Sequence, residues 1–268
     1  MKELDAADLP LAGVKVLDLS RALAGPFCAQ ILSDLGAEVI KIEQVGRPDE
    51  MRSWPPFHDD LACYFAVANR NKRALDLDLK QEEGRALLMR LVRQADVVVE
   101  NFRYGVTEEL RIGYEDMKRE NANIIVCSVR GYGPGAHQDR PAYDAAIQAF
   151  TGIMSVTGDP AGDVQRAGVA VVDFGAAQNA AIAVLGALRR RDRQGKGSHV
   201  EVSLVDTGIS TMSFQLATYL MTGRVIERAG TTHPAMVPCK VFRAADDRSI
   251  LIVVTNNTQY AALAQVLG

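Results

Sequence analysis

Short apolar runs and amphipathic segments alternate along the first half of the chain. Leu11–Ser20 carries apolar residues on both faces, as is typical of a strand buried on both sides. Ala24–Gly36 has helix signals, with a proline in its first turn and a glycine at its end. Ala37–Glu43 has the pattern of a second strand. Because a helix between two strands implies a parallel pair, this stretch predicts a β–α–β unit.

The same order continues to residue 222 and predicts an α/β fold, a Rossmann-like parallel sheet with flanking helices. Further strands are predicted at Asp96–Glu100, Asn123–Val129 and Ser198–Ser203. Further helices are predicted at Gln81–Gln94, Val106–Lys118, Arg140–Phe150 and Leu204–Thr222. Gln44–Ala68 begins irregular and polar and is long for a connection, so it is either functional or a docking segment.

The last part of the chain has a different pattern, which predicts a second domain. Cys239–Arg243, Ser249–Thr255 and Asn257–Gly268 are predicted as strand, strand and helix. We therefore expect a large Rossmann-like domain over residues 1–222, and a linker with the start of a small α+β domain over 223–268. One such unit is short for a domain, so the sequence is expected to be truncated.

Arg166–Arg191 contains the most informative polar residue. Val169–Val172 is predicted as a short strand, and a long helix rich in small residues follows it, with Asp173 at the junction. Ligands bind at such junctions because backbone N–H groups and the positive helix end converge there. Asp173 is either a helix N-cap or a nucleophile that carries an acyl group. Position alone leaves both interpretations open.

A basic segment, Asn69–Lys80, also has two interpretations. It is a solvated turn that leads into an edge strand, or Arg70, Lys72 and Arg73 gather the phosphates of a ligand. The alternation of Leu75, Leu77 and Leu79 favours an edge strand at its end.

Composition narrows the function classes. A net charge of −3 with mixed signs argues against nucleic-acid binding as the main task. The four cysteines have no paired spacing, so we expect reduced thiols in a cytoplasmic protein, with no metal site. No apolar run is expected to span a bilayer, and the polar N-terminus is unlike a secretory signal. The turn after the first strand lacks the GxGxxG pattern of dinucleotide enzymes.

Several long stretches, in order, resemble the class III CoA-transferase family, which includes formyl-CoA transferase, carnitine CoA-transferase and α-methylacyl-CoA racemase. The stretches are LAGVKVLDLSRALAGPFCAQILSDLGAEVIKIE, NKRALDLDLK, ADVVVENFR, GVAVVDFGA and HPAMVP. The resemblance implies that Asp173 is the nucleophile. Its carboxylate would attack an acyl-CoA thioester, form a mixed anhydride and pass CoA to an acceptor carboxylic acid. Coenzyme A would be a substrate, and no prosthetic group is implied.

The resemblance also implies a set of residues that line the CoA site. Two follow the first strand, one follows the second, three flank the adenine and phosphates, and the others line the pantetheine path or contact phosphate. They are Leu23, Ala24, Gln44, Leu77, Asp78, Lys80, Asn101, Phe102, Arg103, Arg111 and Tyr143. Arg111 enters as the substitute for a phosphate-binding arginine whose aligned position here is Glu109.

Departures from the family pattern bear on specificity. Leu23 stands where formyl-CoA transferase has a glutamine, which argues against that substrate. Tyr143 stands where racemases of the family have a histidine, and a tyrosine with an ordinary pKa of about 10 is a poor proton shuttle. Transfer is therefore favoured over racemisation. His233 in the HPAMVP stretch is expected to be a structural loop residue.

Members of the family are interlocked dimers, so the resemblance implies a homodimer. Two alternatives to a transferase stay open on the sequence. The first is a racemase or isomerase of acyl-CoA, and the second is a non-catalytic CoA-binding fragment.

Overall fold

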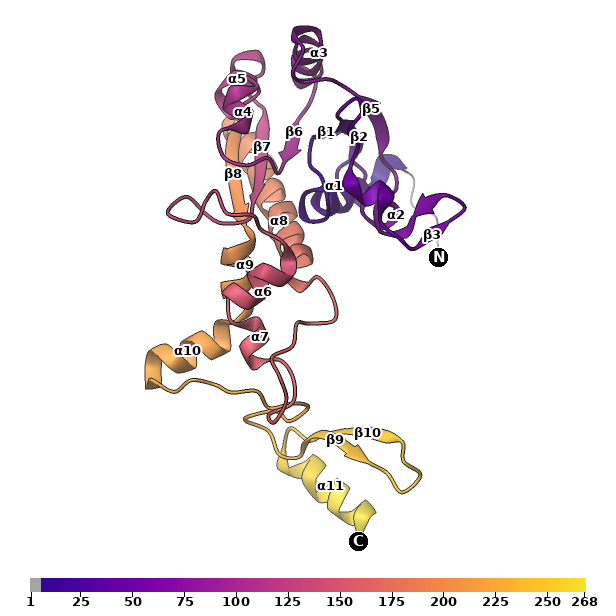
Figure 1. Ribbon diagram of the computed structural model, residues 1–268, viewed down its shortest axis with the longest axis vertical. Helices are drawn as coiled ribbons and strands as arrows, with labels where there is room; N and C mark the ends of the chain where they lie inside the picture. The colour runs from indigo at the N-terminus through magenta and orange to yellow at the C-terminus, as the bar shows by residue number, and fades with distance from the viewer. Residues whose placement is uncertain (1–5) are drawn as a thin grey trace. The chain divides into compact units, whose positions relative to one another are not determined.

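The computed structural model describes residues 6–268, and a six-stranded sheet is the centre of its first compact unit (Figure 1). The strand order is β5–β2–β1–β6–β7–β8, and every neighbouring pair is parallel. The strands are β1 (Lys15–Asp18), β2 (Glu38–Glu43), β5 (Arg73–Asp76), β6 (Val97–Glu100), β7 (Ile125–Arg130) and β8 (Ser198–Ser203). The predicted α/β class with a Rossmann-like parallel sheet is therefore confirmed.

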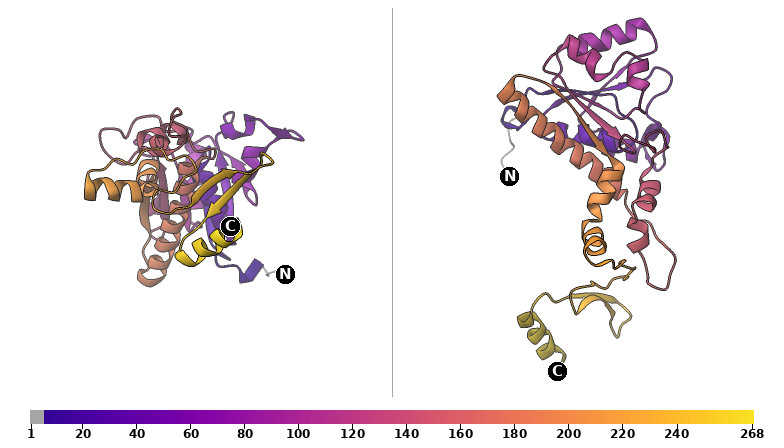
Figure 2. Two further views of the ribbon diagram at one scale, coloured as in Figure 1. Left: turned by 90° about the horizontal axis from the view of Figure 1, so that it is seen from below. Right: turned by 90° about the vertical axis from the view of Figure 1, so that its left-hand side faces the viewer.

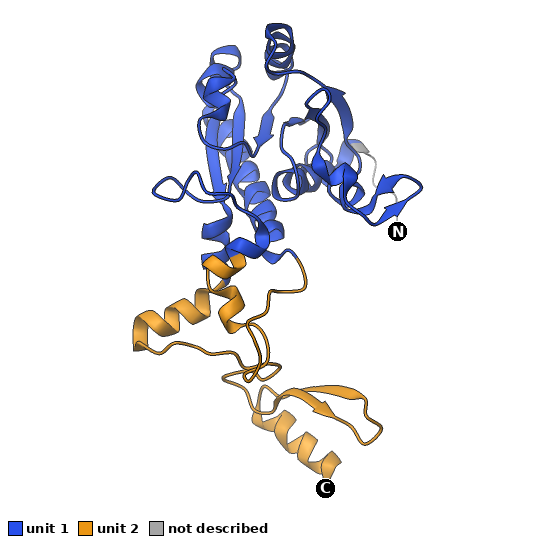
Figure 3. Ribbon diagram, in the orientation of Figure 1, with its two compact units in different colours: residues 1–147, 170–211 blue, residues 148–169, 212–268 orange. Residues whose placement is uncertain are grey.

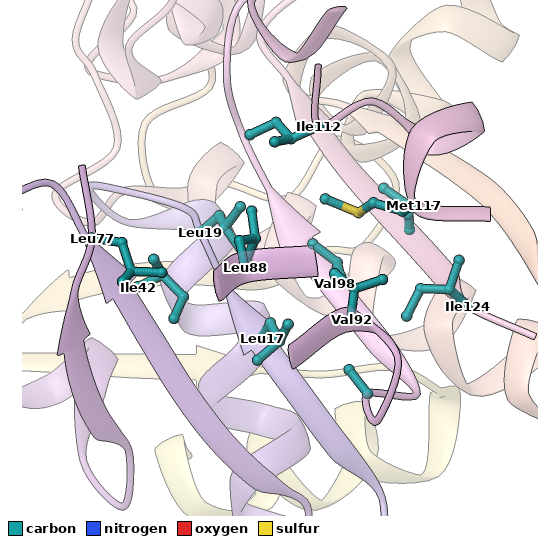
Figure 4. Close-up of a cluster of buried hydrophobic side chains, with 12 residues drawn as sticks. Leu17, Leu19, Ile42, Leu77, Leu88, Val92, Val98, Ile112, Met117 and Ile124 are labelled. Atoms are coloured by element: carbon teal, nitrogen blue, oxygen red, sulfur yellow. The ribbon is translucent and has the colours of Figure 1, made fainter. Parts of the chain in front are cut away.

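Helices cover both faces of this sheet (Figure 2). The four long or central ones are α1 (Ala24–Asp34), α3 (Glu82–Val92), α5 (Tyr114–Glu120) and α8 (Val171–Gln194). α1 and α8 pack against each other and against the strands on one face. On the other face, Leu88 of α3 and Met117 of α5 belong to one apolar cluster with Leu17 of β1 and Val98 of β6 (Figure 4). Burial on both faces explains the apolar runs in these strands, such as VVV in β6, and buried charged residues such as Asp18, Lys41 and Glu100 also lie in them.

The second compact unit comprises residues 148–169 and 212–268, and the first comprises 1–147 and 170–211 (Figure 3). The second unit contains α7 (Ile153–Val156), α10 (Ser213–Thr222), the antiparallel pair β9 (Cys239–Arg243) and β10 (Ser249–Val253), and α11 (Asn257–Leu267). This confirms the predicted strand, strand and helix. The domain boundary predicted after Thr222 stays a prediction.

Several short elements complete the described chain. They are the 3₁₀ turns η1 (Ala6–Asp8) and η2 (Glu50–Ser53), the hairpin β3 (Phe57–His58) and β4 (Leu61–Ala62), and the helices α2 (Cys63–Asn69), α4 (Val106–Glu109), α6 (Asp144–Phe150) and α9 (Leu204–Thr211). α2 lies at the end of the stretch predicted to be a long connection. It forms because Phe65 and Ala68 pack with Met51 and Ala62 in a small separate cluster.

Three predicted helices have different bounds. The helix predicted over 106–118 is two helices, because Arg111 takes a left-handed backbone with φ +56° and Ile112 turns into the core. The helix predicted over 204–222 is α9 and α10, with the break at the buried Met212. The helix predicted from Arg140 begins at Asp144.

The predicted strand at Val169–Val172 is wrong, because α8 already begins at Val171. Asp173 therefore lies in the first turn of this helix, and the N-cap position belongs to Ala170. The physical reason is a contact distant in sequence: the Asp144 carboxylate accepts hydrogen bonds from the N–H groups of Val172 and Asp173.

α8 also corrects the expectation that no apolar run is long enough to span a membrane. By length and hydropathy, this 24-residue helix passes that test. It packs against α1, β7, β8 and α9, and eight of its residues are buried, including Val172, Ala180 and Val184. Core helices of globular domains satisfy the same criterion.

Candidate active site

The carboxyl ends of β1, β2 and β6 surround a largely apolar cavity of about 290 Å³. Gln44 after β2, Lys80 before α3 and Phe102 after β6 all line it, so the structure brings three of the predicted CoA residues together. The complete lining is Leu19, Arg21, Ile42, Glu43, Gln44, Leu79, Lys80, Phe102, Val106, Glu109 and Leu110. We call it the apolar cavity.

A second cavity of about 300 Å³ lies beside the first and shares Arg21 and Phe102 with it. Three more predicted residues, Asn101, Arg103 and Tyr143, line it. Four arginines line it in total, namely Arg21, Arg103, Arg130 and Arg140. We call it the arginine-lined cavity. The two cavities together follow the carboxyl ends of the parallel strands, where ligands of such sheets bind.

Asn101 joins the ends of β1 and β6. Its side-chain oxygen accepts a hydrogen bond from the Arg21 N–H at 2.9 Å, and its side-chain nitrogen donates to the Arg21 carbonyl at 2.7 Å. The Arg21 guanidinium donates to the carbonyls of Arg47 and Pro48. These bonds fix the wall that the two cavities share.

The arginines of the second cavity differ in how far their charge is neutralised. Arg130 is buried and forms an ion pair with Glu100, with 2.8 Å between its Nη2 and the Glu100 Oε1. Arg103 and Arg140 are exposed, and neither has an ion-pair partner within residues 6–268. Their charges are therefore free to attract an anion such as phosphate.

Neighbouring residues shift the pKa values of two groups in the cavity walls, Glu43 and Tyr104. Arg52 donates to both carboxylate oxygens of Glu43, at 2.9 and 2.6 Å. Burial by itself would raise the pKa of Glu43, but the bonds from Arg52 outweigh it and hold that pKa below its ordinary value. Burial, together with the hydrogen bond from its hydroxyl to Glu201, raises the pKa of Tyr104 to about 12.

Asp173 lies in the first turn of α8, and its carboxyl group is largely buried. Burial and the nearby Asp144 charge raise its pKa to about 7. Asp173 lines neither of the two cavities. Tyr143, however, lines the arginine-lined cavity and directly precedes Asp144, whose Oδ1 accepts the Asp173 N–H at 3.3 Å. Asp173 is therefore linked to the lining of this cavity through Asp144, the residue that follows Tyr143.

The other predicted residues lie outside both linings. Leu23 packs on the small cluster around Phe65, and Ala24 is buried as the first residue of α1. Leu77 is buried in the main core, and the Asp78 carboxylate accepts the Lys80 N–H. Arg111 is exposed and lines neither cavity, whereas Glu109 lines the first. Their roles at a CoA site stay predictions.

The three cations of the basic segment form ion pairs within the chain. Arg70 forms an ion pair with Asp34, Lys72 with Asp18 and Arg73 with Glu38. Lys72 is buried in its pair, so it is not available to a phosphate, whereas Arg70 and Arg73 are largely exposed and their part in phosphate binding stays a prediction. The predicted edge strand is confirmed, since β5 begins at Arg73 and lies at the edge of the sheet.

Sequence reasoning missed several residues of the site, among them Arg130 and Arg140 of the arginine-lined cavity, and also Arg21 and Asp144. Arg21 lines both cavities, and its place directly after the first strand was the available signal. Asp144 has no signal of its own, because its partners Val172 and Asp173 are 28 and 29 residues away. No cluster of His, Cys, Asp or Glu able to hold a metal ion was found within the described residues.

The sequence profile of CoA-transferase family III matches residues 11–268. The chain belongs to this family. The family III chain is 41% identical over 268 residues to an acyl-CoA transferase of Fusarium pseudograminearum, a match that covers 96% of this chain and 59% of that protein.

A second relative of this family III chain is the succinate–glutarate CoA-transferase of Agrobacterium fabrum. It is 39% identical over 267 residues, which cover 97% of this chain and 66% of the relative. The crystal structure of a CAIB/BAIF family protein from Brucella suis matches with a TM-score of 0.88 and 39% identity, over 97% of this chain and 70% of that one. The chain thus spans 59% and 66% of the two curated relatives.

Proposed function

We propose that the protein transfers CoA between an acyl-CoA thioester and a carboxylic acid through a covalent intermediate on Asp173. The observation that carries the proposal is the position of Asp173 in the first turn of α8, within a family III chain. Burial and Asp144 raise its pKa to about 7, so near neutral pH a large fraction is ionised and can attack. A carboxylate of raised basicity is also a stronger nucleophile than an ordinary one.

The reaction proceeds by exchange at two carbonyl groups. The Asp173 carboxylate attacks the thioester carbonyl and expels the CoA thiolate, which leaves a mixed anhydride on Asp173. The thiolate then attacks the aspartyl carbonyl, releases the first carboxylic acid and forms an aspartyl thioester. The acceptor carboxylate repeats both steps in reverse, so that acyl-CoA leaves and Asp173 is regenerated. Each step replaces one acyl bond by another and uses no redox chemistry.

The two cavities suit the parts of CoA. The apolar cavity, with Phe102 and aliphatic side chains, fits a base or pantetheine methylenes. The exposed Arg103 and Arg140 in the arginine-lined cavity supply charge for phosphate groups. For the acyl groups, short dicarboxylic acids are the class to test first, because one relative at 39% identity is named a succinate–glutarate CoA-transferase.

The decisive experiment is mass spectrometry of the protein after incubation with succinyl-CoA, glutaryl-CoA and acetyl-CoA, with hydroxylamine or borohydride as the trap. We expect modification of the peptide that contains Asp173 and its loss in Asp173→Asn. Asp192→Asn, at the exposed far end of the same helix, is the matched control and should be modified like the wild type.

Two results would contradict the proposal. One is CoA exchange with these substrates in the absence of any adduct on Asp173. The other is an Asp173→Asn variant that is folded and still transfers CoA at the wild-type rate.

A cytoplasmic location and an interlocked homodimer belong to the same proposal. The location is supported by four free cysteines, of which Cys28 and Cys127 are buried. Recovery of the protein in a membrane or extracellular fraction would contradict it.

A further inference from the structure

The first turn of α8 has its hydrogen-bonding cap on a different element. Ala170 occupies the N-cap position and has no side-chain acceptor to offer the first N–H groups of the helix. The acceptor is Asp144, the first residue of α6, which is only 8% exposed. Its Oδ1 accepts from the N–H of Val172 at 2.9 Å and of Asp173 at 3.3 Å.

This arrangement places a second carboxylate beside the proposed nucleophile and ties it to the same peptide unit. We propose that Asp144 is a positioning residue for Asp173: its Oδ1 fixes the backbone from which the Asp173 side chain projects, and its negative charge acts on the Asp173 carboxyl group. That this positioning matters for catalysis rests on the proposed function, whereas the hydrogen bonds from Val172 and Asp173 to Asp144 are observed in the structure.

Other charged groups near α8 do not compete for this role. The elements packed against α8 carry Cys28 and Asp34 on α1, Cys127 and Arg130 on β7, His199 and Glu201 on β8, and Asp206 on α9. Asp34 pairs with Arg70, Arg130 with Glu100, and Asp206 bonds to Ser203. Burial and Asp144 are the two causes that raise the pKa of Asp173 within the described chain.

Packing around the same turn supports a fixed position. The Phe174 ring meets the Phe27 ring of α1 edge to face, with 4.8 Å between centroids. The Thr207 methyl group of α9 lies so close to Gly175 that an added Cβ there would meet it at 2.9 Å. The two residues that follow Asp173 are therefore held by α1 and α9, so a change at residue 144 acts on a helix end whose position is already fixed.

Two variants separate the hydrogen bonds from the charge. Asp144→Asn keeps an oxygen that can accept both N–H bonds and removes the charge, whereas Asp144→Ala removes both. In Asp144→Asn we expect the titration midpoint of the Asp173 carboxyl, followed by ¹³C NMR without substrate, to fall by about one pH unit. In Asp144→Ala we expect amide hydrogen exchange at Val172 and Asp173 to accelerate at least about tenfold, with little change in Asp144→Asn.

The same variants have a kinetic readout with succinyl-CoA. The ratio of the acylation rate of Asp173 at pH 6 to that at pH 9 should rise about threefold to fivefold in Asp144→Asn, because more of the carboxyl is ionised at pH 6. The absolute rate at pH 9 should fall, since a less basic carboxylate is a weaker nucleophile.

The outcomes distinguish this inference from the proposed function. If wild-type protein forms no adduct with any acyl-CoA but Asp144→Asn still shifts the NMR midpoint, the function fails and the positioning role stands. If the midpoint is unchanged in Asp144→Asn and exchange at Val172 and Asp173 is unchanged in folded Asp144→Ala, the inference is overturned even when adducts form. Should Asp144→Ala not fold, the midpoint in Asp144→Asn decides alone.

Discussion

At the scale of the residue, the candidate site depends on one carboxyl group with an unusual environment. Burial raises the pKa of Asp173 most, and the Asp144 charge adds to it, so the value reaches about 7. When this carboxyl group is ionised it lowers the stability of the folded state, because the charge is better solvated in the unfolded chain. The reactive form of Asp173 is thus also the form that the folded protein stabilises least.

This conflict predicts a pH-dependent stability. Between the unfolded pKa of 3.8 and the folded value of about 7, the native state binds more protons at Asp173 than the unfolded state. The free energy of unfolding of the wild type should therefore fall as pH rises through this window, by about 2 kcal/mol from pH 5 to pH 8.

The measurement is urea unfolding of the wild type and Asp173→Asn at both pH values. The neutral asparagine lacks this titration, so its stability relative to the wild type should increase from pH 5 to pH 8. If the difference in free energy of unfolding between the two proteins is the same at pH 5 and pH 8, the pKa of Asp173 is not raised in the folded protein.

At the scale of elements, a buried charge cluster joins the ends of β1, β2 and α1. Lys72 Nζ lies 2.7 Å from the Asp18 carboxylate and donates to the Pro26 carbonyl at 2.7 Å. Lys41 Nζ lies 2.9 Å from Asp49 and 3.9 Å from Asp18. Burial alone would raise the pKa of Asp18, but Lys72 and Lys41 outweigh it and lower that pKa. The cluster holds the turn that leads into α1, beside the cavities.

We expect Lys72→Met to lower the free energy of unfolding by about 3 kcal/mol, because it leaves the buried Asp18 without its nearest cation. Arg73→Met is the matched control. Its pair with Glu38 is largely exposed, so the loss should stay within about 1 kcal/mol. Urea unfolding of both variants measures the two losses, and equal losses would show that the cluster has no special role.

At the scale of the whole molecule, the exposed apolar side chains of α10 suggest that a partner covers them. Phe214, Leu220 and Met221 are 85, 79 and 84% exposed. Three large apolar side chains on one short helix are typical of a surface buried in an assembly. The proposed homodimer is the partner that the family resemblance offers.

We therefore predict that light scattering after size-exclusion chromatography gives about twice the chain mass of 29.1 kDa. Replacement of both Phe214 and Leu220 by Asp should shift the protein to the mass of one chain, because burial of two charges at an apolar interface is unfavourable. A wild-type mass of one chain at micromolar concentration would refute the homodimer.

Local patterns predicted the sheet and most helices correctly, because strands covered on both faces carry runs of apolar residues and helices covered on one face carry an apolar stripe. The runs before Asp18, Glu43, Glu100 and Arg130 became parallel strands as expected. The errors lie where a distant contact decides the backbone: Phe65 joins a cluster that turns residues 63–69 into a helix, and Asp144 caps the helix that begins at Val171.

Sequence by itself determined the α/β class, the family and the presence of an aspartate at a helix start, because these follow from local periodicity and contiguous matches. Tertiary structure decided which residues form the site. It placed Gln44, Lys80 and Phe102 around one cavity, put Leu77 into the core, and used Lys72 as the partner of Asp18. It also set Asp144 beside Asp173. Charge pairing and helix capping act through space, so residues far apart in the chain acquire their roles only when the fold brings them together.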